Sequence, residues 1–132
     1  MTPYDTSFDP PAIVLPVTVA SVVHRRPRLE APALIDTGAD ITALPESFVE
    51  RLKLYPIGRL NLEDASAVKT AVFTYEANVT FNGKPAKKME VVLTPYPFII
   101  LGRDWLQDYY VLLNGPDQQF QLDDKPLPIQ DS

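Results

Sequence analysis

One carboxylate in this chain follows an apolar run and enters a tight turn, an arrangement that suits acid–base chemistry. An Ala-Leu-Ile run at residues 33–35 leads into Asp36, and Thr37 and Gly38 follow it. A carboxylate at the end of a buried strand is costly to ionise unless hydrogen bonds or a partner group share its charge. The Asp-Thr-Gly sequence occurs once in 132 residues. The chain therefore supplies one such acid, which suggests half of an active site.

A second apolar segment, at residues 98–101, ends at Gly102 and Arg103. Together the two segments resemble the retropepsin-like aspartic proteases, whose halves each supply an apolar-apolar-Asp-Thr-Gly-Ala turn and an apolar-apolar-Gly segment. The resemblance covers roughly residues 17–113. It implies a homodimeric aspartic endopeptidase in which two chains build one active site, act on peptide or protein substrates and use no metal or other cofactor.

The resemblance assigns roles to the residues of the Asp-Thr-Gly turn. It implies that Asp36 from each chain shares one proton with its counterpart and activates a water, and that the Thr37 hydroxyls hydrogen-bond across the dimer axis. Gly38 would allow the backbone to approach the substrate closely. The residues that it places against the substrate are Ala39 and Asp40 beside the turn, and Ala65, Ser66 and Ala67 at the tip of a flap-like hairpin.

Two residues of the second segment would support the catalytic turn. In the resemblance, Gly102 permits the chain to cross behind the turn, and Arg103 pairs with Asp40. A buried guanidinium–carboxylate fork would hold the turn in register through charge-assisted hydrogen bonds.

Each of these residues also has a purely structural explanation. Asp36 can be the corner of an Asx turn, because Asp-Thr-Gly favours turns in any protein. Asp40 can cap the segment that follows it, and Asp104 can be a surface charge or a helix cap. His24 lies among basic residues and is interpreted as a solvated turn residue. The aromatic residues Trp105, Tyr109 and Tyr110 are interpreted as core and interface packing.

The alternative function is a protease-like dimer that binds peptides or serves as an assembly module without cleaving them. Residues 60–69, where the flap would lie, contain no glycine, although retroviral members place several there. The intact Asp-Thr-Gly-Ala motif opposes this alternative, since a pure binder has no physical need for two facing carboxylates. A third hypothesis is a monomer in which Asp36 has no partner.

Other site chemistries lack their residues in this sequence. The chain has no cysteine and no paired histidines, so thiolate metal sites and thiol or triad catalysis are excluded. Neither a phosphate-binding glycine loop with its Lys-Ser/Thr end nor a His-Glu-x-x-His zinc motif is present. A divalent cation held by Asp36 and Asp40 would need more oxygen ligands than this loop can be shown to supply.

Composition predicts one globular domain that does not bind nucleic acid. Of the 132 residues, 45% are hydrophobic and 22% charged, and the formal net charge of -5 disfavours phosphate-backbone binding. The only local basic cluster is His24, Arg25, Arg26 and Arg28, which is interpreted as a solvated hairpin tip rather than a phosphate site. Residues 1–11 are polar, with no leader or membrane-span pattern, so we expect a cytoplasmic protein without a membrane partner.

Fourteen prolines against five glycines disfavour long helices, so the fold is predicted to be mainly β with one or two short helices. The resemblance implies a closed, barrel-type acid protease lobe, one per chain. Predicted strands are 13–23, 29–35, 77–81, 89–93 and 98–101, with a hairpin over 58–76 whose tip lies near 64–68 and a hairpin over 111–123 around Asn114-Gly115. Residues 103–110 are predicted to form a helix of one or two turns, and residues 44–54 either a helix or an irregular loop. The domain limits are 1–12 for an N-terminal extension, 13–123 for the protease-like domain and 124–132 for a mobile tail.

Overall fold

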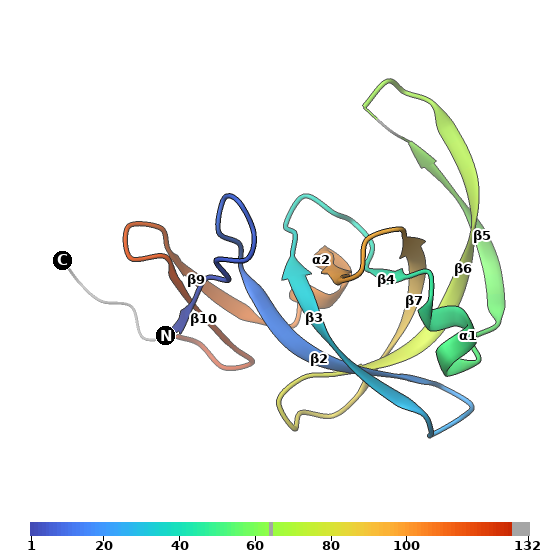
Figure 1. The fold of residues 1–132 in the computed structure, drawn as a ribbon, viewed down its shortest axis with the longest axis horizontal. Helices are drawn as coiled ribbons and strands as arrows, with labels where there is room; N and C mark the ends of the chain where they lie inside the picture. The colour runs from blue at the N-terminus through green and yellow to red at the C-terminus, as the bar shows by residue number, and fades with distance from the viewer. Residues whose placement is uncertain (64, 128–132) are drawn as a thin grey trace.

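Six strands of the chain pair in a ring and form a closed barrel (Figure 1). The computed structural model describes residues 1–63 and 65–127. The strands of the ring, in order, are β2 (Val14–Ser21), β3 (Arg28–Ile35), β8 (Ile99–Leu101), β4 (Ala43–Pro45), β7 (Lys87–Thr94) and β6 (Lys69–Thr80). Antiparallel pairing of β6 with β2 closes the ring. The predicted mainly-β barrel fold is therefore confirmed.

The barrel interior is filled by side chains that alternate along the strands. In β2, Leu15, Val17 and Val19 are buried, while Pro16 and Thr18 between them face outward. This period of two is what a strand with one face on a core requires. The core also receives residues of two short helices, α1 (Phe48–Leu52) and α2 (Arg103–Leu106). Trp105 of α2 is fully enclosed and stacks on Tyr109 with ring centroids 4.3 Å apart.

The pairing of β3 with β8 brings the two sequence motifs to one edge of the barrel. These strands run parallel, with Ile35 opposite Leu101. Because both strands end at this point, the residues that follow them, Asp36 and Gly102, leave the sheet side by side. The register of β3 with β8 therefore brings together two segments that lie more than sixty positions apart in the sequence.

A long hairpin extends from the barrel wall. β5 (Pro56–Glu63) pairs with the first half of β6, and Figure 1 shows the end of this hairpin standing away from the barrel. The predicted hairpin over residues 58–76 is confirmed, although Asp64 in its expected tip lies outside the described residues. The predicted strand at 77–81 is a continuation of β6, which turns at Asn82 and Gly83, both at positive φ, and pairs with β7.

The helices are shorter than predicted. Leu44 and Pro45, at the start of the region 44–54 predicted as helix or loop, belong to strand β4 instead, because Leu44 is fully buried between β8 and β7. Only Phe48–Leu52 is helical, and Lys53 ends the helix in the left-handed region at φ 56°. The predicted helix at 103–110 is α2, whose single turn lies within the expected one or two, but Tyr110 already belongs to the next strand. In both places tertiary pairing overrides helical preference.

A second, three-stranded sheet holds both ends of the described chain. β9 (Tyr110–Asn114) and β10 (Gln119–Asp123) form the predicted C-terminal hairpin, and β1 (Thr2–Pro3) pairs with β10 on its other side. Residues 1–12 thus include a strand of this sheet. Lys84 forms an ion pair of 3.0 Å with Asp124 at the start of the expected tail, whose residues 128–132 lie outside the described range. Within the described chain, neither helix is long and apolar enough to span a membrane.

Candidate active site

Backbone hydrogen bonds set the orientation of the Asp36 carboxylate. The Asp36 amide donates to the carbonyl of Leu101 at 3.0 Å, which attaches the turn to β8. The Gly38 amide donates to Asp36 Oδ1 at 2.9 Å, and the Ala39 amide donates to the Asp36 carbonyl at 3.2 Å. A Cβ at Gly38 would lie 3.3 Å from Asp36 Oδ1, so glycine leaves the carboxylate room. The half-buried carboxylate is held by its own turn at the mouth of the barrel.

Gly102 lies directly behind this turn. Its backbone runs so close to the turn that an added Cβ would lie 2.9 Å from the carbonyl carbon of Ile41 and 3.0 Å from the carbonyl oxygen of Ala39. The next residue, Arg103, donates its amide to the same Ala39 oxygen at 2.9 Å. The two segments therefore contact through backbone atoms, and no side chain fits between them.

We expect Gly102→Ala to destabilise the fold by roughly 1–3 kcal/mol, the usual cost of overpacking a rigid contact. The atoms that the new methyl group meets are backbone, so they cannot move aside as a flexible side chain would. Gly102 has φ -90°, which alanine adopts without strain, so the effect isolates the steric contact. Urea unfolding measures the loss, with Gly115→Ala as control because nothing lies within 4 Å of its added Cβ. Equal stability of the two variants would contradict the close contact.

A buried threonine links the two segments a second time. The Thr42 hydroxyl accepts a hydrogen bond from the Gly102 amide at 3.1 Å and donates one to Asp104 Oδ1 at 2.8 Å. The Thr42 amide donates to Asp104 Oδ2 at 3.0 Å, and the Trp105 amide donates to Asp104 Oδ1 at 2.9 Å. Asp104 is therefore half-buried, so its interpretation as a surface charge is wrong. Thr42 was missed by sequence reasoning, because only the fold brings it to position 104.

Thr42→Val is expected to lower the free energy of unfolding by about 2 kcal/mol, because it leaves the buried Gly102 amide without its acceptor. Valine has nearly the shape of threonine, so packing is preserved while both hydroxyl hydrogen bonds are lost. Thr42→Ser keeps the hydroxyl and is the matched control, which should retain most of that stability. Chemical unfolding of the three proteins tests this. A valine variant as stable as wild type would show that the hydroxyl contributes little to the free energy of unfolding.

Asp40 and Arg103 form an ion pair at the rim of the site. Arg103 Nη2 contacts Asp40 Oδ1. The expected fork was buried, but in the single chain the Arg103 and Asp40 side chains are 62% and 81% exposed. An exposed pair of this kind contributes only about 0–1 kcal/mol to folding. The buried fork is therefore wrong for the isolated chain, since both residues lie at the end of the barrel rather than under it.

An open groove of about 800 Å³ runs past Asp36. Its lining comes from three parts of the chain: the segment around Asp36, strand β5 as one wall, and the end of β7 with Ile100 of β8 as the far wall. The lining residues are Asp36, Gly38, Ala39, Asp40, Ile41 and Ala43 from the turn side, Asn61, Leu62 and Glu63 from β5, and Val92, Leu93, Thr94, Pro95 and Ile100 from the far wall. Eight of the fourteen lining residues are apolar, so the groove can accept apolar groups.

The structure gathers some of the predicted site residues and not others. Asp36, Gly38, Ala39 and Asp40 all line the groove, and Thr37 is exposed beside it. The residues predicted at the hairpin tip, Ala65, Ser66 and Ala67, do not line it. The strand that leads to the tip supplies the wall instead, because the hairpin end stands away from the barrel (Figure 1). The far-wall residues were missed, since their apolar sequence looks like ordinary core.

The groove of a single chain contains half of what two-carboxylate chemistry requires. Asp36 has no carboxyl group as a hydrogen-bond partner among residues 1–63 and 65–127. Asp40, the neighbouring acid, is held by Arg103. In the same described ranges, no cluster of three or more His, Cys, Asp or Glu side chains is arranged to hold a metal ion. A lone Asp36 can accept or donate one proton, and a second acid must come from elsewhere.

Comparison with known proteins finds a matching protein family and several solved structures of similar fold. The family described as "gag-polyprotein putative aspartyl protease" matches residues 28–108, which include the turn, the groove walls and α2. The EIAV protease solved with the inhibitor HBY-793 is similar, with 24% identity and a TM-score of 0.53 over 74% of this chain and 86% of that one. The simian foamy virus (mac) protease has 22% identity and a TM-score of 0.52 over 70% and 92% of the two chains. A foamy viral protease-reverse transcriptase bound to an RNA/DNA hybrid aligns over 91% of this chain and 13% of its own, with 22% identity and a TM-score of 0.55. No curated protein sequence gives a significant match.

Proposed function

This chain belongs to the gag-polyprotein aspartyl protease family, and we propose that it is an aspartic endopeptidase whose active site forms from two Asp-Thr-Gly turns in a homodimer. One observation carries the proposal: the family's Asp-Thr-Gly turn presents a half-buried carboxylate to an open, mostly apolar groove. A single chain holds one such acid. The two-fold pairing of identical turns supplies the second without any further sequence.

Hydrolysis would use the two carboxylates in opposite protonation states. Like charges held about 3 Å apart cannot both ionise, so the pair retains one proton, as in aspartic proteases generally. The ionised Asp36 takes a proton from a water whose oxygen attacks the peptide carbonyl carbon, while the protonated one donates to the carbonyl oxygen. The resulting diol collapses when one of its hydroxyl groups returns a proton to the ionised carboxylate and the C–N bond breaks, while the nitrogen leaves with the proton that the other carboxyl group held. No metal takes part.

The residues around Asp36 would position this pair and the substrate. The Gly38 amide holds one oxygen of the carboxylate, leaving the side chain oriented toward the groove. We assign Thr37 to bracing the two turns across the dimer axis, and Ala39 and Asp40 to the substrate backbone. Ala65, Ser66 and Ala67 would contact the peptide after the hairpin folds over the groove. Gly102 and Arg103 would support the turn from behind.

An exposed apolar strand supports the homodimer. β9 pairs with β10, and no other described strand pairs with its second edge. Its residues Tyr110, Val111, Leu112 and Leu113 are all exposed, on both faces of the strand. An apolar sheet edge of this kind invites pairing with another strand. A second copy of β9 is the occupant that would also bring a second Asp36.

The direct test is cleavage of an undirected peptide library by the wild-type protein between pH 3 and pH 7, with products read by mass spectrometry and the oligomer checked by sedimentation. Cleavage beside apolar residues by a dimer supports the proposal. A dimer that binds peptides without cutting them would favour the alternative, an inactive peptide-binding or assembly module. The glycine-free flap region is the observation that motivates this alternative. A monomer at all accessible concentrations would contradict both.

A further inference from the structure

A second hollow, of about 570 Å³, lies at the opposite end of β3 from Asp36. β3 begins at Arg28 and ends at Ile35, so eight residues separate the two places, roughly 25 Å at the rise of a strand. The lining residues come from β2, the loop after it, β3, β6 and the segment before β7: Thr18, Ala20, Ser21, Val22, Arg25, Arg28, Asn78, Thr80 and Ala86. A ligand here would not touch the groove.

Strand register explains why this surface is hollow. Ala20 of β2 lies opposite Arg28 on one side and Asn78 on the other. Thr18, the next outward residue, lies opposite Thr80. Small side chains therefore occupy the centre of the face formed by β3, β2 and β6, and longer polar side chains surround them.

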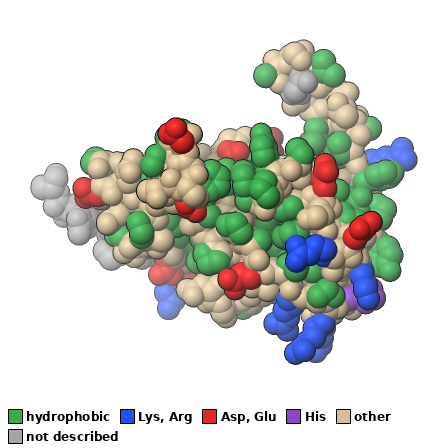
Figure 2. Space-filling model, in the orientation of Figure 1, with side chains coloured by type: hydrophobic (Ala, Val, Ile, Leu, Met, Phe, Trp, Pro, Cys, Tyr) green, Lys and Arg blue, Asp and Glu red, His purple; other side chains and the backbone are tan. Residues whose placement is uncertain are grey.

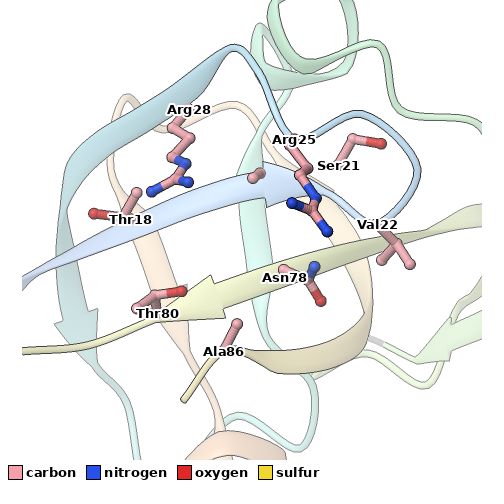
Figure 3. A pocket seen from close by; sticks show the side chains of 9 residues that line it. Thr18, Ser21, Val22, Arg25, Arg28, Asn78, Thr80 and Ala86 are labelled. Atoms are coloured by element: carbon pink, nitrogen blue, oxygen red, sulfur yellow. The ribbon is translucent and has the colours of Figure 1, made fainter. Parts of the chain in front are cut away.

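Two arginines from different segments reach over this face. Figure 3 shows the guanidinium group of Arg28 toward Thr18 and that of Arg25 toward Asn78, both on the same side of the sheet. The loop that carries Arg25 is anchored at its start, because the Ser21 hydroxyl oxygen accepts hydrogen bonds from the amides of Val23 and His24, each at 3.1 Å. The arginines are thus placed by the sheet and by a hydrogen-bonded loop.

No described carboxylate forms an ion pair with Arg25 or Arg28, the two arginines of this hollow. None of the nine lining residues is acidic. Glu30 shares the outward face of β3 with Arg28 but does not line the hollow. Figure 2 shows Lys and Arg side chains gathered at this end of the molecule, around the single histidine. In a chain of net charge -5, such a concentration of cations can attract an anion.

We propose that the hollow between Arg25 and Arg28 binds the phosphoryl group of a small ligand. A phosphoryl group offers three acceptor oxygens and close to two negative charges, so it matches two guanidinium groups better in charge and in acceptors than a carboxylate, which has two oxygens and one charge. The hydroxyls of Thr18 and Thr80 and the amide of Asn78 add neutral donors below. Arg25, Arg26 and Arg28 are all exposed at the end of the β2–β3 hairpin, as the interpretation of a solvated tip expects, and the proposal adds a ligand for the two that line the hollow.

The test is a titration of ¹⁵N-labelled protein with sodium phosphate at constant ionic strength, followed by amide chemical shifts. We expect saturable shifts confined to the loop after β2 and to the strand positions that line the hollow. Arg25→Gln and Arg28→Gln should each weaken binding at least about tenfold, since each removes charge-assisted hydrogen bonds. Arg26→Gln is the matched control, because Arg26 lies in the same loop outside the lining and should leave affinity unchanged.

Both lining arginines are exposed, so the variants should fold, and thermal unfolding confirms this for each. Equal weakening by Arg26→Gln would overturn the proposal, because it would reveal a general charge effect. Acetate binding as tightly as phosphate, or shifts that never saturate, would also overturn it. Adenosine monophosphate in a second titration separates the sources: tighter binding than phosphate assigns a nucleotide, and equal or weaker binding assigns inorganic phosphate. Because no step involves proteolysis, the outcome is independent of the proposed function.

Discussion

Asp36→Asn is expected to abolish peptide hydrolysis, with a loss on the order of 10⁴-fold or more, while the dimer remains. Asparagine keeps an oxygen that can accept the hydrogen bond from the Gly38 amide, so the turn should be preserved. It cannot take a proton from water, and the partner's asparagine cannot supply one. Cleavage of the best library peptide by wild type and variant, at equal dimer concentration, measures the effect.

The chain contains a matched control for this substitution. Asp5 is followed by Thr6 and Ser7, and its Oδ1 accepts the Ser7 amide at 2.8 Å, much as Asp36 Oδ1 accepts that of Gly38. Hydrogen bonds from the Ser7 hydroxyl and amide lower the pKa of Asp5. Asp5→Asn alters the same kind of turn away from the groove and should leave cleavage unchanged. If Asp36→Asn retained wild-type activity, the shared-carboxylate mechanism would be wrong.

The pH profile provides a second readout of the same pair. Catalysis requires one protonated and one ionised carboxylate, so the rate should fall at low pH, where both are protonated, and at high pH, where both are ionised. The two limbs belong to the pair and not to either residue alone. A rate that rises through a single step would indicate one acting acid.

Local sequence patterns predicted the turn and its supporting segment well. The apolar runs before Asp36 and Gly102 each form a strand; β3 leads into the Asp-Thr-Gly turn, and β8 leads into Gly102 at the start of α2. The Asn82-Gly83 pair similarly marks the turn between β6 and β7. These signals lie within a few residues of the structure they specify, which is why one sequence suffices to find them.

Features that depend on distant pairing could not be predicted in the same way. Thr42 and Asp104 are 62 positions apart, and nothing local marks either as a partner of the other. β4 has helix-compatible neighbours, and only its place between β7 and β8 makes it a strand. The hollow beside Arg28 exists because Ala20 lies opposite it, a matter of register between strands. In each case the deciding contact is made by another part of the chain.

The dimer can be tested at β9 with Leu113→Lys, which should raise the dissociation constant of the dimer at least about 100-fold and abolish cleavage at working concentrations. Leu113 is 52% exposed in the single chain, so lysine costs little there. Placed between two apolar strand edges, the same charge would lose its water without gaining a partner. Sedimentation equilibrium and cleavage assays over a concentration series measure both effects.

Ile57→Lys is the matched control, because Ile57 has nearly the same side chain and is 51% exposed, yet it lies in β5 outside the groove lining. If it behaves like wild type while Leu113→Lys becomes a monomer, the effect belongs to the β9 edge. A Leu113→Lys protein that stays dimeric and active would place the interface elsewhere without affecting the role of Asp36. A Leu113→Lys protein that stays dimeric but loses activity would show that β9 aligns the two turns without being needed for assembly. Leu113→Lys and Asp36→Asn together therefore distinguish failure of the interface from failure of the chemistry, because only Asp36→Asn should inactivate a dimer that is fully formed.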